Sequence, residues 1–250
     1  MSFDRRIAWG ALVVAAVLLG GCGGDSDRDA SPSSAAEPTT TSTKTELDSC
    51  ATAEDGTIVE IPVGGDTLDG IVVGEGGVGV VLAHQNPGNL CSWLPFARRL
   101  AEKGHAALAF DFETYLDPGE SVVAAADELR RRGAREIVLV GASMGGTASL
   151  VAAGSDPGVA GVVSVSGPEA FRGLDAGAAV EGLEAPVLLI VARGDAEFVP
   201  DARRLFRSAR SADKRLVVLP GSGHGTDFFG EPVGGRAPEL VEAFVAARGR

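Results

Sequence analysis

From residue 57 onward, short apolar runs alternate along the chain with segments in which apolar residues recur at every third or fourth position. Short runs rich in Val and Ile predict buried strands, and the longer period predicts amphipathic helices. The strands expected are 57–63, 68–73, 78–83, 105–110, 136–140, 159–165, 186–191 and 215–219, and the helices expected are 95–103, 120–132, 144–153, 201–209 and 238–247. The first two strands read as a hairpin, and the others predict a mostly parallel sheet with helices on both faces, which is the α/β class.

The N-terminal segment has a different pattern. Two arginines in MSFDRR precede an uninterrupted apolar run, Ile7–Gly20, which has the length of a signal-peptide core and is short for a membrane span. The run ends in LGGC, residues 19–22, which resembles the bacterial lipobox. This resemblance implies a signal peptide over residues 1–21 and lipidation of Cys22, and hence an exported lipoprotein on the extracytoplasmic side of a bacterial cell membrane. An ordinary secretory signal cut near Gly21, with Cys22 left as a free thiol, also exports the chain.

Residues 22–48 have almost no large apolar side chains, so they predict a disordered tether between the anchored cysteine and a globular domain. A chain of about 25 residues spans on the order of 25–30 Å. The remaining residues, 49–250, suit one domain by length. The formal net charge of the whole chain is -12, and the basic residues are scattered, so the sequence offers no surface for nucleic acid.

The stretch GASMGG, residues 141–146, lies between a predicted strand and a predicted helix. The pattern G-x-S-x-G at such a junction is typical of a nucleophile elbow, in which a serine sits on a strained turn. Ser143 is therefore the candidate nucleophile. A Gly-rich turn without chemistry is the alternative, because the chain contains 35 Gly and such patterns arise by chance.

A base and an acid follow in the required order. His224 lies in LPGSGHGT, residues 219–226, directly after the last predicted strand, and can take the proton of the serine hydroxyl. Asp195 lies in ARGDAEFVP, residues 192–200, after the preceding strand, where a carboxylate would orient the imidazole. Glu197 is the alternative acid, and a further possibility is that both carboxylates are plain surface charges.

With Ser143, Asp195 and His224 in this order, residues 49–250 resemble the α/β-hydrolase superfamily, and in particular its cap-less, dienelactone-hydrolase-like and esterase-like serine hydrolases. The resemblance implies an eight-stranded sheet that starts with an antiparallel pair and carries the elbow after its fifth strand. It also implies an oxyanion hole formed by backbone N–H groups.

The oxyanion donors implied are the N–H of Met144 and an N–H from the loop in VVLAHQNPG, residues 80–88. Gln85 and Asn86 are the candidates for the second donor, and Gln85 stands where the family usually has Gly. His84 is interpreted as a structural residue at the end of a strand. Only about twenty residues, 166–185, occupy the place where relatives insert a helical lid, so no cap domain is expected.

The function predicted is that of an exported, lipid-anchored serine hydrolase, a carboxylesterase of the EC 3.1.1 type, which acts through an acyl-enzyme on a small or exposed ester in solution or in the cell envelope. Peptidases, thioesterases and acyltransferases use the same residues. A surface lipoprotein that uses the fold as a non-catalytic binding scaffold is the alternative from another class. No cofactor motif occurs, and His84, His105 and His224 lack the spacing of metal ligands.

Cys50 and Cys91 predict a disulfide. Export makes their oxidation possible, and with Cys22 modified they have only each other as partners. The alternative is a pair of thiols that are buried separately as small apolar residues. The bond would hold the start of the domain against the loop that bears Gln85 and Asn86.

Overall fold

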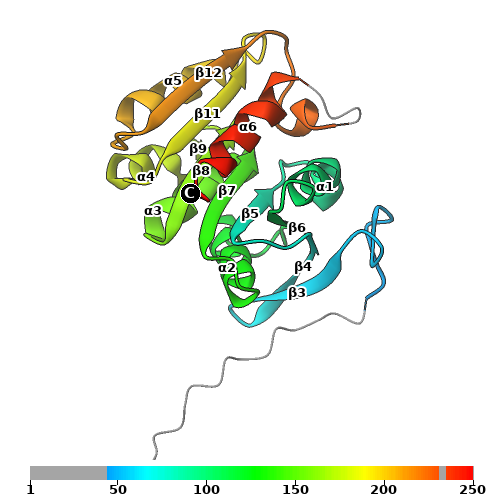
Figure 1. Cartoon of the computed structure of the whole chain (residues 1–250). Helices are drawn as coiled ribbons and strands as arrows, with labels where there is room; N and C mark the ends of the chain where they lie inside the picture. The colour runs from blue at the N-terminus through cyan, green and yellow to red at the C-terminus, as the bar shows by residue number, and fades with distance from the viewer. Residues whose placement is uncertain (1–43, 231–234, 250) are drawn as a thin grey trace, which may run out of the picture. The chain divides into compact units, whose positions relative to one another are not determined.

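The computed structural model describes residues 44–230 and 235–249. The predicted signal peptide, Cys22 and most of the predicted tether lie outside these residues. The main sheet contains β3 (Thr57–Val63), β4 (Asp66–Val73), β5 (Val78–Ala83), β6 (Ala106–Phe110), β7 (Glu136–Ala142), β8 (Val159–Val165), β11 (Val187–Ala192) and β12 (Lys214–Leu219). Their order across the sheet is β12-β11-β8-β7-β5-β6-β4-β3 (Figure 1).

The strand pairing confirms the predicted architecture. β3 and β4 form an antiparallel hairpin, and β4 also pairs antiparallel with β6. Every other pair in the sheet is parallel. β7 is the fifth strand of this sheet in chain order and lies between β5 and β8, so Ser143 follows a central strand.

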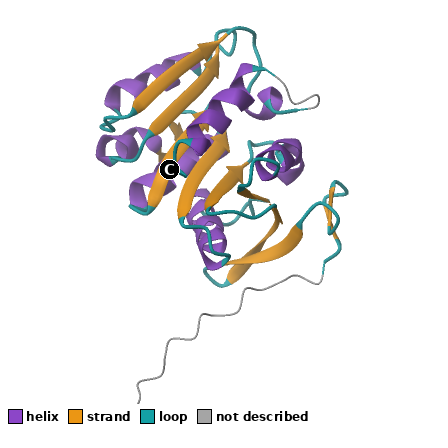
Figure 2. Ribbon diagram, viewed as in Figure 1, coloured by secondary structure: helices purple, strands orange, loops and turns teal. Residues whose placement is uncertain are grey.

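The helices lie in two layers (Figure 2). They are α1 (Leu94–Ala101), α2 (Pro118–Arg131), α3 (Met144–Ser155), α4 (Ala176–Gly182), α5 (Val199–Ser208) and α6 (Arg236–Ala246). Side chains of α2, α3, α4 and α5 share one apolar cluster with Ile137 and Leu139 of β7, whereas α1 and α6 share the other cluster with Val138 and Val140. Successive side chains of a strand point to opposite faces, so one continuous apolar run fills both cores.

Residues 166–185 form a short hairpin and a helix. The hairpin pairs β9 (Ala170–Phe171) with β10 (Leu174–Asp175), and α4 follows at once, capped by the Asp175 side chain, which accepts a hydrogen bond from the N–H of Ala178 at 2.9 Å. None of these three elements was predicted from the sequence. Over the residues described, the chain has no cap domain, as expected.

The domain starts earlier than the predicted boundary at residue 49. β1 (Glu46–Leu47) pairs antiparallel with β2 (Ala51–Thr52), and the side chain of Leu47 is buried in one of the two cores. Glu46 and Leu47, which were assigned to the tether, are therefore part of the folded structure, and the ammonium of Lys44 hydrogen-bonds Asp69 of β4 at 2.6 Å. The predicted disulfide is present: Cys50 is bonded to Cys91 in the short helix η1 (Leu90–Ser92), with Cα atoms 5.8 Å apart.

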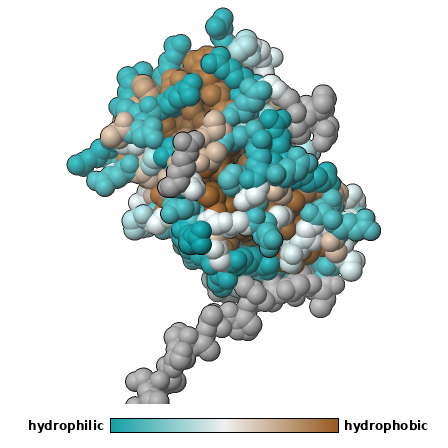
Figure 3. Space-filling view, in the orientation of Figure 1, coloured by the Kyte–Doolittle hydropathy of each residue, from teal (hydrophilic) through white to brown (hydrophobic). Residues whose placement is uncertain are grey.

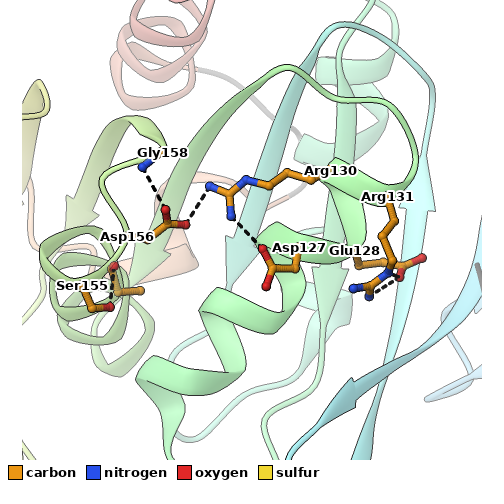
Figure 4. A network of polar contacts seen from close by, with 8 residues as sticks. Asp127, Glu128, Arg130, Arg131, Ser155, Asp156 and Gly158 are labelled. Atoms are coloured by element: carbon orange, nitrogen blue, oxygen red, sulfur yellow. Dashed lines mark hydrogen bonds and ion pairs between the residues drawn. The ribbon is translucent and has the colours of Figure 1, made fainter. Parts of the chain in front are cut away.

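Ion pairs gather at the amino-terminal ends of β7 and β8, where α2 and α3 end (Figure 4). Arg130 bridges Asp127 of its own helix at 2.8 Å and Asp156 at 2.7 Å. The other oxygen of Asp156 accepts the N–H of Gly158 at 2.9 Å. Glu128, which is 1% exposed, pairs with two further arginines, Arg131 at 2.6 Å and Arg132 at 2.5 Å. These contacts join the end of α2 to the loop that links α3 to β8.

Hydrophilic residues cover most of the visible face over the helices, with apolar residues showing between the elements (Figure 3). Tyr115, at 66% exposure, is a large hydrophobic side chain that is exposed. Within residues 44–230 and 235–249, no helix has both the length and the hydropathy to cross a membrane.

Candidate active site

Ser143 occupies a strained turn between β7 and α3. Its φ of 47° and ψ of -115° lie in a region that L-residues rarely adopt, and its N–H donates to the carbonyl of Val165 at 2.8 Å. The flanking glycines are required sterically. A Cβ on Gly141 would lie 2.0 Å from the carbonyl oxygen of Gly145, and a Cβ on Gly145 would lie 2.2 Å from that of Ala83. This is the backbone geometry of a nucleophile elbow rather than of an ordinary Gly-rich turn.

His224 and Asp195 are hydrogen-bonded to each other. Nδ1 of His224 lies 2.8 Å from Oδ2 of Asp195, and the carboxylate side chain is only 9% exposed. With the Nδ1–H donated to this carboxylate, Nε2 is the nitrogen that can accept a proton. The Phe198 ring packs on the imidazole, with centroids 4.3 Å apart. Glu197 is exposed, so the geometry favours Asp195 as the acid and excludes the reading of both carboxylates as surface charges.

A backbone hydrogen bond joins the two loops beside the elbow, and a second hydrogen bond orders the histidine loop internally. The N–H of Gly194 donates to Gly221 at 2.7 Å, which joins the acid loop to the start of the histidine loop. His224 precedes the short helix η2 (Gly225–Phe228), and its own N–H donates to Asp227 at 3.0 Å. A Cβ on Gly225 would lie 3.3 Å from the Cβ of Ala142. The residue after the histidine therefore contacts the residue before the serine.

The N–H groups at the start of α3 point out of the helix at the same edge. The first intrahelical bond there runs from the N–H of Thr147 to the carbonyl of Ser143 at 3.1 Å, so the helix does not use the N–H of Met144. Free N–H groups and the positive end of the helix dipole favour negative charge at this position. Gln85 and Asn86 follow β5 at the same edge of the sheet, and both stay candidates for the second oxyanion donor.

His84 is buried and holds two strand ends together. Its side chain is 4% exposed, its Nδ1 lies 2.7 Å from the carbonyl oxygen of Gln85, and its Nε2 accepts the N–H of Phe112 at 3.1 Å. Burial lowers the pKa of His84, which keeps the ring neutral. Since both ring nitrogens are engaged by the backbone, His84 is suited to a structural role, as interpreted from the sequence, and not to that of a second base.

A carboxyl group that the sequence analysis did not single out lies beneath this ring. Asp111 follows β6, accepts the N–H of Leu90 at 2.6 Å, and lies 3.7 Å from Nε2 of His84. The pKa of Asp111 is raised to about 7, mainly by burial and to a smaller extent by the carboxyl groups of Asp48 and Asp69, while the hydrogen bond from the Leu90 N–H lowers it. No motif marks such a residue, because its pKa depends on the packing of β1, β2 and η1 around it.

A cavity of about 310 Å³ opens beside the elbow. Its walls include His84, Asn86, Phe112, Tyr115, Met144 and Arg172. Met144 ties this cavity to Ser143, its neighbour in sequence, and Arg172 comes from the β9–β10 hairpin. A larger hollow of about 550 Å³ lies along α2 and the β3–β4 turn. Ser143, Asp195 and His224 line neither hollow, but the smaller one includes Met144, the residue next to Ser143, and is therefore the candidate substrate cavity.

In the part of the chain that the structure describes, no group of three or more His, Cys, Asp or Glu side chains is arranged to hold a metal ion.

Known proteins resemble this chain in sequence and fold. Residues 113–232, which include Ser143, Asp195 and His224, match the Dienelactone hydrolase family. The solved dienelactone hydrolase from Anabaena variabilis is 27% identical, with a TM-score of 0.61 over 76% of this chain and 94% of the other. The chain has the α/β-hydrolase fold. Among curated proteins, no sequence matches it.

Two further structures share the fold of this hydrolase. The putative dienelactone hydrolase from Klebsiella pneumoniae is 20% identical, with a TM-score of 0.60 over 77% of this chain and 97% of the other. The monoacylglycerol lipase from Paleococcus ferrophilus is 18% identical, with a TM-score of 0.61 over 72% and 99%. At these identities the likeness extends to the fold alone. The resemblance to a cap-less, dienelactone-hydrolase-like hydrolase that the sequence indicated is confirmed.

Proposed function

We propose that this hydrolase is a serine carboxylesterase in which Ser143 is the nucleophile, His224 the base and Asp195 the residue that orients the base. The observation that carries the proposal is the 2.8 Å bond between His224 and Asp195, on loops that contact the strained turn at Ser143. A serine hydroxyl is a weak nucleophile at neutral pH, so the activated imidazole is what makes attack possible.

The reaction proposed proceeds in two steps. Oγ of Ser143 attacks the ester carbonyl carbon as Nε2 of His224 takes the hydroxyl proton, and the N–H of Met144 with one from the Gln85–Asn86 turn stabilises the oxyanion. The tetrahedral intermediate collapses, the imidazolium gives its proton to the leaving alcohol, and an acyl-enzyme remains. Water then attacks the acyl carbon, with His224 again as the base, and releases the acid and the free serine.

The cavity limits the substrate that fits. A volume of about 310 Å³ accommodates a small acyl or alkoxy group, and no lid covers it among the residues described. A small ester, or an ester that is exposed on a larger molecule, is therefore the proposed substrate. We also propose that the protein is exported and lipid-anchored through Cys22, on the basis of the N-terminal sequence.

Hydrolysis of chromogenic p-nitrophenyl esters of increasing acyl length tests the esterase activity. We expect turnover that is highest for short chains and falls as the acyl group outgrows the cavity. The Ser143→Ala protein serves as the control at the same concentration. Equal rates for the two proteins, or a rate that rises steadily with long acyl chains, would contradict the proposal.

Peptidases, thioesterases and acyltransferases with the same triad are separated by running matched amide, thioester and ester substrates side by side. Faster turnover of the amide than of the ester would indicate a peptidase. A non-catalytic scaffold is the remaining alternative, and it predicts no turnover on any of the three substrates.

A further inference from the structure

The side chain of Gln85 crosses from the end of β5 to the histidine loop. Its Oε1 accepts the N–H of Thr226 at 2.8 Å, a contact between residues 141 positions apart in the chain. Thr226 is 7% exposed, so its N–H has little access to water as a substitute acceptor. Because the N–H of Thr226 is a donor, the atom of the Gln85 amide that faces it must be the oxygen, and this fixes the orientation of the amide.

The histidine loop is packed directly on this amide. Gly225, between His224 and Thr226, has a φ of +56°, and a Cβ built on it would lie 2.1 Å from Oε1 of Gln85. Glycine is therefore needed for two reasons: it tolerates the backbone conformation, and it leaves room for the amide oxygen. The loop and the Gln85 side chain fit together as one unit.

The backbone of Gln85 is itself held in place. Its carbonyl oxygen lies 2.7 Å from Nδ1 of the buried His84, whose Nε2 accepts the N–H of Phe112 at 3.1 Å. A hydrogen-bonded path therefore runs from the ends of β5 and β6 to the residue two positions after His224. The hydrogen bond from the N–H of His224 to Asp227, by contrast, lies within the loop itself.

We propose that Gln85 is a positioning residue, which sets the distance between His224 and Ser143 by holding the N–H of Thr226. Proton transfer between a serine and an imidazole requires placement to within about 0.5 Å, and a Gly-rich loop needs contacts with its surroundings to supply this. This role belongs to the side chain of Gln85 and is separate from that of its backbone N–H as an oxyanion candidate. It also gives a reason for glutamine where the resembling family usually has glycine. The proposal rests on the triad proposed above.

The test uses two substitutions of similar length. Gln85→Met keeps the size of the side chain but removes the acceptor, and we expect kcat on a short-chain p-nitrophenyl ester to fall by about 10- to 100-fold with KM within about twofold of wild type. Gln85→Glu keeps an oxygen acceptor and adds a negative charge beside the loop. We expect it to recover most of kcat at neutral pH and to move the acidic limb of the kcat profile to higher pH, because a nearby carboxylate favours the imidazolium form.

Ser211→Ala is the matched control for a general loss of stability. Ser211 is buried, and its Oγ donates to the carbonyl of Asp213 at 3.3 Å just before β12, at the opposite end of this strand from the histidine loop. We expect the substitution to lower the melting temperature while kcat and the pH profile stay at wild-type values.

The inference is overturned if Gln85→Met keeps kcat within twofold of an active wild type, or if Gln85→Glu is as impaired as Gln85→Met. It is also overturned if Ser211→Ala loses as much kcat as Gln85→Met for the same loss of melting temperature. A wild-type protein that neither turns over esters nor reacts with a fluorophosphonate would overturn the proposed function together with this inference.

Discussion

At the amino-terminal ends of β7 and β8, ion pairs between charged side chains link the end of α2 to the loop between α3 and β8, whereas at the carboxyl-terminal ends the site is built on tight turns with uncommon backbone conformations. Glu128 and Arg130 each pair with two oppositely charged side chains. Ser143, by contrast, has a strained φ of 47°, and Gly225 has a φ of 56° that glycine adopts without strain. The charged side chains at the first end pair with each other, and at the second end the side chains of Asp195 and Gln85 hydrogen-bond to His224 and Thr226 of the histidine loop.

The ion pairs at the first end contribute to stability, whereas the residues at the second end are arranged for chemistry. Removing one partner of an ion pair that is at least partly buried destabilises the folded state, because the remaining charge loses its compensation. Strained residues and unpaired donors cost stability and remain in place because the surrounding packing holds them there. Substitutions at the two ends are therefore expected to affect different measurements.

The largest expected effect is on the chemistry of the strained end. Ser143→Ala should reduce ester turnover by roughly 10⁵-fold or more and leave the melting temperature close to that of wild type, because it removes the nucleophile and little packing. Ser149→Ala, in the same helix, is the matched control, since Ser149 Oγ is buried with no hydrogen-bond partner. If Ser143→Ala kept a tenth of wild-type turnover, Ser143 would not be the nucleophile.

A somewhat smaller effect is expected from the acid. Asp195→Asn should lower kcat by roughly 10³- to 10⁴-fold, because an amide no longer holds His224 in the tautomer with a free Nε2. Glu197→Gln changes a carboxylate two residues away that is exposed, and its kcat should stay within about twofold of wild type. A greater loss in Glu197→Gln than in Asp195→Asn would transfer the role to Glu197.

At the opposite end the effect should fall on stability instead. Glu128→Ala leaves Arg131 and Arg132 without their shared carboxylate, and we expect it to cost about 3 kcal/mol in the free energy of unfolding. Its kcat per folded molecule should equal that of wild type well below the melting temperature. Glu181→Ala on the exposed face of α4 is the control for loss of a helical glutamate. Urea unfolding checks the stability, and a loss of kcat in Glu128→Ala would show that the two ends are coupled.

The smallest expected effect is a pH dependence of stability at the strained end. The pKa of Asp111 is raised to about 7 from an ordinary 3.8, so the folded protein holds a proton that the unfolded chain releases. Full linkage at about 1.4 kcal/mol per pKa unit gives about 4 kcal/mol over pH 4 to 7. Because the Asp111 side chain is 22% exposed and water screens it, we expect the free energy of unfolding to fall by about half of this, about 2 kcal/mol. Asp111→Asn keeps an oxygen for the Leu90 N–H and cannot titrate. Urea unfolding at a series of pH values should show a weaker decline for the variant, and identical slopes would contradict the shifted pKa.

Most of the fold could be predicted from the sequence, because continuous apolar strands and period-3.6 helices repeat through the whole domain. The bounds of β3, β5 and β8 agree with the predicted ranges. The short elements could not be predicted. β9, β10 and α4 lie in a stretch rich in Gly and Ala, where local preference is weak and the buried side chains of Leu174 and Val180 decide the structure.

The residues of the site also fall into two groups, those that a local sequence pattern marks and those that only the folded structure brings together. Ser143 and His224 stand in local patterns, G-x-S-x-G after a strand and a Gly-flanked histidine after the last strand, so both could be singled out. The contact of Gln85 with Thr226 could not, because it joins two loops that only the folded sheet brings together. Asp111 was missed for the same reason, since its pKa depends on burial by segments distant in sequence.

The central claim is that Ser143 is a nucleophile activated by His224 and Asp195, and mass spectrometry of a fluorophosphonate adduct tests it most directly. The account predicts one adduct on wild-type protein, located on the peptide that contains Ser143, and labelling slowed by several orders of magnitude in both His224→Ala and Asp195→Asn. Absence of an adduct at high reagent concentration, an adduct on another serine, or unchanged labelling in His224→Ala would contradict it.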